Sequence, residues 1–150
     1  MPRLLIFAPC DRVIFGTGDL SASLIMILHT LQIHSEATPS TASLLYRFSV
    51  FSQWYKSPDD EGKTFEQKVS LARGNENPIL ENITAFQMTA HVHRIAANFQ
   101  KLPPLTAGEY NLVLTVRVQG ESQWSQPIAS YPLNILEMPK PQPQKESLVQ

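Results

Sequence analysis

Two histidines one residue apart, His91 and His93, are the most chemically suggestive pair in the sequence. Side chains two positions apart lie on the same face of a β-strand, so this spacing would point both imidazoles the same way. Such a pair can chelate zinc or copper, but a zinc site needs three or four ligands. No pattern in the sequence brings the other histidines, His29 and His34, near them. The pair therefore predicts either a metal site or two solvated side chains on a wet strand face.

The other candidates for chemistry are weaker. The acidic run Asp59-Asp60-Glu61 could serve a calcium loop, but calcium needs six to eight oxygen ligands and no second loop carries paired carboxylates. Cys10 follows Pro9 in an apolar strand, where a buried cysteine is usually inert. As the only cysteine, it excludes an intramolecular disulfide. The sequence has no Gly-x-Ser-x-Gly nucleophile elbow. We therefore predict a protein that is not an enzyme and needs no cofactor.

The segment GTGD, residues 16–19, has the composition of a tight hairpin turn or of a fragment of a phosphate loop. A phosphate loop needs a helix after it. The residues that follow, SASLIMILHTLQIH, are rich in Ile and Leu at strand spacing. We therefore expect a hairpin. Residues 24–28 are apolar on both parities, which is typical of a central strand buried on both faces.

Composition and charge exclude several classes of protein. The chain has 150 residues, enough for one domain with its own core. Charged residues make up 17%, which is low for a helical bundle, and twelve prolines favour strands and loops. The formal net charge of −1 argues against a nucleic-acid binder. No run approaches the roughly 18 apolar residues of a membrane span. We expect a cytoplasmic protein that binds neither nucleic acid nor membrane.

The clearest pattern in the chain is the alternation of apolar and polar residues over TAGEYNLVLTVRVQG, residues 106–120. Period two is the signature of a strand with one buried face. The residues expected to face the core are Tyr110, Leu112, Leu114, Val116 and Val118. The residues expected to face solvent are Asn111, Thr115, Arg117 and Gln119.

Similar patterns recur along the chain. The other predicted strands cover residues 4–15, 24–28, 43–55, 65–72, 84–96 and 129–135. Pro9 and Pro132 interrupt two of these segments. Pro9 predicts an edge strand or a bend in the strand, and Pro132 predicts an edge strand. About seven strands with short connections indicate an all-β fold, a two-sheet antiparallel β-sandwich of the immunoglobulin-like kind. We expect one sandwich domain over residues 3–137 and a proline-rich, flexible tail over residues 138–150.

Two parts of the sequence carry a resemblance to a known family. The first is CDRVIFGTGDLSASLIMILHTLQIH, with its strand, glycine-containing turn and apolar strand, and the second is the closing pattern of Pro104, Gly108 and Tyr110 followed by Pro127 and Leu133. Together they resemble a family of small bacterial immunoglobulin-like β-sandwich proteins, a domain of unknown function. The resemblance implies the sandwich fold and a hydrogen bond from Tyr110 back to the backbone at a corner. It implies no catalytic residue.

Function is therefore expected from surfaces rather than from chemistry. Leu45 and Phe51 fall on the strand face that polar residues mark as wet, and Trp54 and Tyr55 end the same strand. We predict a non-enzymatic interaction or structural module that binds a protein partner or self-associates. These four residues, or an edge strand, would form its contact surface. The alternative is a metal-binding protein or metal-dependent enzyme that uses the face of His91 and His93.

Overall fold

The computed structural model describes residues 1–17, 21–34 and 47–138, and in these ranges the chain forms β-strands and no α-helix. The strands are β1 (Arg3–Phe15), β2 (Ala22–Ile27), β3 (Thr30–His34), β4 (Phe48–Tyr55), β5 (Thr64–Ala72), β6 (Leu80–Gln87), β7 (Val92–Phe99), β8 (Gly108–Val118) and β9 (Ala129–Met138), with a 3-10 turn at Pro58–Asp60. The predicted all-β class is confirmed.

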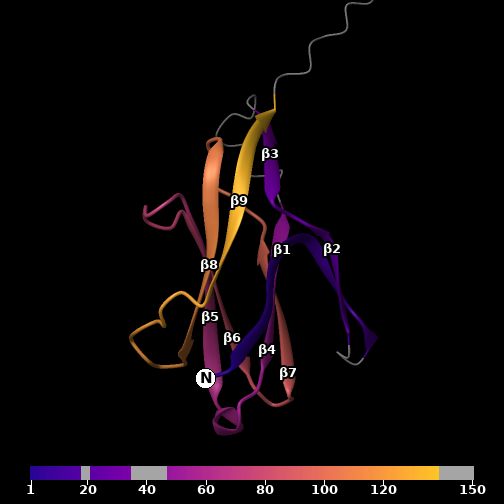
Figure 1. Ribbon diagram of the computed structural model, residues 1–150, viewed down its shortest axis with the longest axis vertical. Coiled ribbons are helices and arrows are strands. Elements are labelled where there is room, and N and C mark those ends of the chain that lie inside the picture. The colour runs from indigo at the N-terminus through magenta and orange to yellow at the C-terminus, as the bar shows by residue number, and fades with distance from the viewer. Residues whose placement is uncertain (18–20, 35–46, 139–150) are drawn as a thin grey trace, which may run out of the picture.

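The strands form two sheets, with the orders β2-β1-β4-β7 and β3-β9-β8-β5-β6 (Figure 1). The first sheet is antiparallel throughout, whereas β3 pairs with β9 in parallel. The prediction of two sheets is confirmed. The prediction of about seven strands, all antiparallel, is wrong, because the described residues contain nine strands and one parallel pair.

One of the additional strands comes from a segment that the sequence pattern joins. Residues 84–96 alternate almost without a break, but the structure divides them between β6 in one sheet and β7 in the other. Phe86 and Met88 are both fully or nearly buried in the central cluster. Met88 lies in the link between the strands, so the apolar alternation continues where the chain crosses from one sheet to the other.

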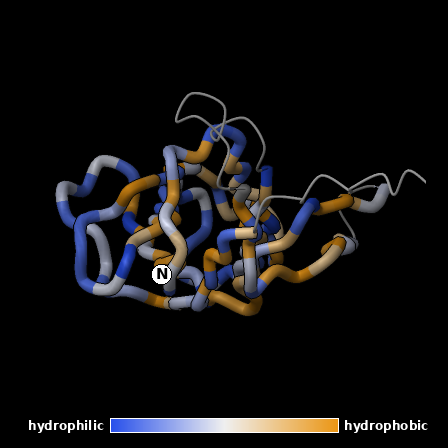
Figure 2. The backbone as a smooth tube through the Cα atoms, turned by 90° about the horizontal axis from the view of Figure 1, so that it is seen from above, coloured by the Kyte–Doolittle hydropathy of each residue, from blue (hydrophilic) through white to orange (hydrophobic). Residues whose placement is uncertain are grey.

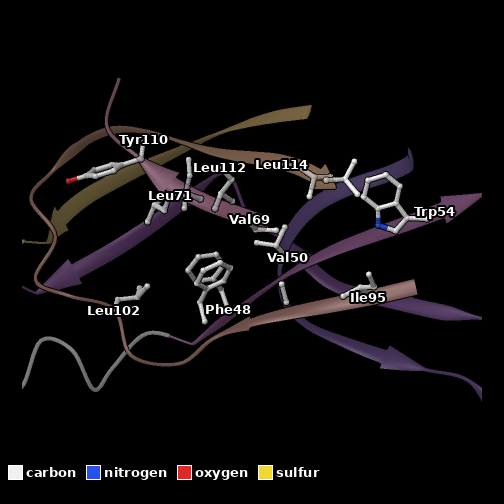
Figure 3. Packing of buried hydrophobic residues seen from close by; sticks show 14 of the residues in the cluster. Phe48, Val50, Trp54, Val69, Leu71, Ile95, Leu102, Tyr110, Leu112 and Leu114 are labelled. Atoms are coloured by element: carbon white, nitrogen blue, oxygen red, sulfur yellow. The ribbon is translucent and has the colours of Figure 1, made fainter. Parts of the chain in front are cut away.

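The core lies between the two sheets, where inward side chains of both interdigitate (Figure 3). Tyr110, Leu112, Leu114 and Val116 of β8 are buried as predicted, and Val118 is half-buried. On the opposite face, Gln119 is exposed, whereas the side chains between the inward positions are only half-exposed. Arg117 on this face pairs with Glu66, and its Nε lies 2.6 Å from Glu66 Oε2.

The predicted tyrosine corner is present at the start of β8. The Tyr110 hydroxyl donates a hydrogen bond to the Thr106 backbone oxygen at 2.9 Å. The Arg73 guanidinium lies 5.8 Å from the Tyr110 ring centroid and donates to Thr106 Oγ1 at 2.9 Å. Gly108 has φ +146°, and a Cβ there would come within 2.7 Å of Arg73. These contacts fix the entry of β8 into the sheet.

The two prolines do not mark edge strands, contrary to the prediction. Pro9 lies in β1, between β2 and β4, and Pro132 lies in β9, between β3 and β8. Each proline nevertheless lies where the pairing with one of its two neighbouring strands ends. β2 pairs with β1 only from Cys10 onward, and β3 pairs with β9 only from Asn134 onward. The missing N–H of each proline therefore removes no regular ladder bond.

Candidate interaction surface

The structure separates the environments of the two histidines. His93 is half-buried on β7, and its ring stacks on Phe86 with centroids 5.3 Å apart. His91 is exposed before β7 begins, and its backbone oxygen accepts a hydrogen bond from Lys56 N at 2.9 Å. The expected placement of both on a wet strand face is therefore wrong for His93. Among residues 1–17, 21–34 and 47–138, no three or more His, Cys, Asp or Glu side chains gather where they could hold a metal ion.

The four residues predicted to contact a partner do not form one exposed patch. Leu45 lies outside the described residues. Phe51 is 2% exposed, although it lies on the face of β4 opposite to the central core cluster. Trp54 is fully buried, and its Nε1 donates to Gln67 Oε1 at 2.9 Å. Tyr55 alone is exposed, at 41%, and the Arg3 guanidinium lies 5.4 Å from its ring centroid.

An apolar surface does exist, at a place that the sequence reasoning assigned to the core. Beyond Cys10, β1 leaves β4 and pairs only with β2. We call this hairpin, Asp11–Phe15 with Ala22–Ile27, the arm. Figure 1 shows it extending away from the two packed sheets. Its exposed large apolar side chains are Ile14 at 51%, Phe15 at 42%, Met26 at 69% and Ile27 at 56%.

The arm is apolar on both of its faces. Residues paired across an antiparallel ladder point to the same side, so the register assigns the faces. The register places Arg12, Ile14, Ser23, Ile25 and Ile27 on one face, and Val13, Phe15, Ala22 and Leu24 on the other. Strand alternation adds Asp11 and Met26 to the second face. In Figure 2 the hydropathy colours show orange stretches on the side where Figure 1 places β2, as well as in the two packed sheets without the arm, which we call the body. Among the described elements, only β1 makes extensive contact with β2.

The backbone of the arm is strained at its most exposed side chain. Met26 has φ +53°, the single positive φ found for a non-glycine residue in the described ranges. This conformation costs free energy for a side chain with a Cβ, and such strain gathers at functional positions. The paired register runs from Cys10–Ile27 to Arg12–Ile25 and omits Met26 opposite Asp11. The strain therefore places an exposed thioether next to a break in the ladder.

The sequence pattern does not predict the arm, because apolar residues on both faces of a strand are expected to be buried by other strands of the same chain. Residues 24–28 are apolar on both parities, which predicts a strand covered on both sides. The structure instead makes β2 the edge of its sheet, so the prediction of a central strand is wrong. The expected hairpin after β1 is confirmed by the β1–β2 pairing and by the 2.8 Å bond from Gly16 N to the Ser21 oxygen.

A small hollow lies near the root of the arm. It is lined by Asp11, Arg47, Phe48, Ser49, Asn98, Phe99 and Gln100 and has a volume of about 220 Å³. Pockets for small molecules are typically ~300–1,000 Å³ and mostly apolar. This hollow is smaller and polar, and part of its lining is already paired, since Ser49 Oγ donates to Asn98 Oδ1 at 2.7 Å. The arm is therefore the better candidate for binding.

Comparison with known proteins finds no matching family model and no matching curated protein. The described residues include no helix with the length and apolar character needed to cross a bilayer. We therefore infer the function from the geometry of the arm.

Proposed function

We propose that this protein is a non-enzymatic interaction module that binds another protein chain through the β1–β2 arm. The observation that carries the proposal is the exposure of Ile14, Phe15, Met26 and Ile27 on a hairpin whose β2 strand has extensive contacts with no described element other than β1. Contiguous exposed apolar side chains are rare on monomeric proteins and mark interaction surfaces. Burial of such side chains stabilises a complex in the same way as it stabilises a core.

The shape of the arm favours a protein over a small molecule. A small ligand is held in a concave pocket that surrounds it, whereas the arm projects and is apolar on both faces. A partner must therefore extend along the hairpin or close around it, as a polypeptide can. The tyrosine corner supports an immunoglobulin-like relationship of the sandwich behind the arm. We include in the proposal the cytoplasmic location that the sequence predicts.

Site-specific photo-crosslinking tests the proposal. A benzophenone amino acid in place of Met26 should form covalent adducts with a protein chain upon irradiation of the full-length protein, alone or in an extract of its source cells. The matched control carries the same group in place of Ile83, which is 54% exposed on β6. Adducts from position 26 that exceed those from position 83 support the proposal. Equal yields from both positions, or none from position 26, overturn it.

A further inference from the structure

The free edge of β2 is the part of the arm that nothing in the described fold uses. β2 hydrogen-bonds to β1 on one side, and its other side ends the sheet. Edge strands usually carry charges, prolines or other devices that prevent pairing with a second chain. Two of the other edge strands carry ionisable side chains, namely Glu81 in β6, and His93 and Arg94 in β7. β2, with the sequence ASLIMI, contains neither charge nor proline.

We infer that the chain bound by the arm is a second copy of this protein, with the two β2 strands paired antiparallel along their free edges. This inference rests on the proposed function, because it names the partner of the same surface. The pairing would join two four-stranded sheets across a two-fold axis perpendicular to them. Such an interface is isologous, so the same surface must complement itself.

The sequence of the arm has this self-complementarity. A two-fold axis perpendicular to the sheet pairs residues of the same face, so the axis passes beside Leu24 or Ile25. With the axis at Leu24, Ala22 of one copy lies between its own Phe15 and Met26 of the second copy. With the axis at Ile25, Ser23 lies between its own Ile14 and Ile27 of the second copy. In both registers a small residue lets exposed apolar side chains of the two copies meet.

The charges of the arm also permit a second copy. Asp11 and Arg12 are its two charged side chains in the described ranges, and both lie on β1, so the arm has no net charge there. In the paired sheet the two β1 strands are three strand spacings apart, or ~14 Å. This separation exceeds the Debye length of ~8–10 Å in physiological salt, so like charges repel little. The chain as a whole has a formal charge of −1.

Analytical ultracentrifugation of the purified full-length protein tests the inference. The protein should dimerise reversibly, and Ile27→Lys should weaken the dimer at least tenfold, because it brings a charge into the apolar contact. Ile83→Lys is the matched control, since Ile83 is equally exposed on another edge strand. It should leave the dimer unchanged. Circular dichroism establishes that both variants fold. A dimer that Ile27→Lys and Ile83→Lys weaken to the same extent would place the interface elsewhere.

Cysteine crosslinking reads the register directly. Residues opposite each other in an antiparallel pair have Cα atoms ~4.5–5.5 Å apart, which suits a disulfide. Leu24→Cys or Ile25→Cys, whichever lies beside the axis, should form a covalent dimer upon mild oxidation, and Ile83→Cys should not. Covalent dimer from neither arm variant overturns the pairing.

The outcomes separate this inference from the proposed function. A monomeric purified protein whose position 26 still crosslinks to a different protein would exclude the second copy and keep the arm as a binding site. A monomer that crosslinks to nothing would overturn both proposals.

Discussion

The two halves of β1 have the same kind of sequence and different neighbours. In the first half, Leu4 and Phe7 pack against the central core cluster and residues 8–10 are buried, whereas Leu5 and Ile6 are exposed. In the second half, Ile14 and Phe15 are about half-exposed. The strand is continuous, so the difference comes from its neighbours. The first half pairs with β4 and packs some of its side chains against the core, whereas the second half pairs only with β2.

The comparison shows what apolar side chains do when the fold does not cover them. Elsewhere on the surface, some large side chains such as Ile83 are exposed as well, whereas Trp124 is covered by charged side chains. Arg117 and Lys68 place their cations 4.2 Å and 4.6 Å from the centroid of its ring. The long stems of these cations shield the indole, and the charged ends stay in water. The exposed apolar side chains of the arm have no recorded cation over them, and we propose that they serve binding.

The first prediction is that side chains of the body contribute more to the stability of the fold than side chains of the arm. Leu114→Ala should lower the free energy of unfolding by ~2–5 kcal/mol, because it leaves a cavity in a fully buried site. Ile14→Ala should change it by less than ~0.5 kcal/mol, because the side chain is already half in water. Urea denaturation at a concentration where the protein is monomeric measures both. Similar losses would mean that the arm folds as part of the core.

The second prediction concerns a polar cluster buried between the two sheets. Gln67 is fully buried, and its Oε1 accepts hydrogen bonds from Ser52 Oγ at 2.7 Å and from Trp54 Nε1 at 2.9 Å. Its Nε2 has no hydrogen-bond partner among the described residues. Gln67→Met removes that unpaired donor but leaves two buried donors without an acceptor, each costing ~1–3 kcal/mol. We expect a net loss of about 1–4 kcal/mol in the free energy of unfolding.

A double-mutant cycle sharpens this expectation. Adding Ser52→Ala to Gln67→Met removes one of the two stranded donors, so the second change should cost less in the variant than in the parent protein. Equal costs of Ser52→Ala in both backgrounds would show that the hydroxyl and the amide are not coupled. The arm contains no corresponding buried polar group, so loss of a polar side chain there should carry no such penalty.

The sequence predicts the inside of this fold better than its edges. In β8, alternation identifies the buried residues, since Leu112, Leu114 and Val116 each contact the same core. Tyr110 is predicted equally well, because its corner is formed by residues only a few positions away. Which strands lie at the edges of a sheet, and where each strand ends, depends on pairing between residues far apart in the sequence. The break between β6 and β7 is hidden by Met88, which keeps the apolar period through the link.

The candidate site could not be predicted from the sequence for a related reason. Phe51 breaks the alternation of β4, which predicts an exposed position, yet it is buried on the face opposite to the core. Met26 and Ile27 fit a buried strand and are exposed. A pattern of apolar residues reports that a side chain requires cover. It does not report whether a neighbouring strand of the same chain or another molecule provides that cover.

The last and smallest effect concerns the body end of β1, which an ion pair anchors. The Met1 ammonium lies 2.9 Å from Asp60 Oδ1, Ser57 N donates to Asp60 Oδ2 at 3.0 Å, and Ser57 Oγ donates to the Met1 oxygen at 3.1 Å. Burial alone would raise the pKa of the Asp60 carboxyl. Hydrogen bonds from the N-terminal amine and Ser57, together with the positive charge of the amine, outweigh burial and hold that pKa below its usual value.

A carboxyl whose pKa is lower in the folded protein stabilises it above the pKa of the unfolded chain, about 3.9, and this contribution is lost as the pH falls through the folded pKa. We therefore expect the free energy of unfolding to decrease below about pH 4, and Asp60→Asn to reduce that decrease. The matched control is Asp59→Asn, because Asp59 is exposed in the same 3-10 turn. Denaturation between pH 3 and 7 measures all three proteins. If Asp60→Asn and the parent protein show the same pH dependence, the first half of β1 is held by packing alone, and the two halves differ only in their apolar cover.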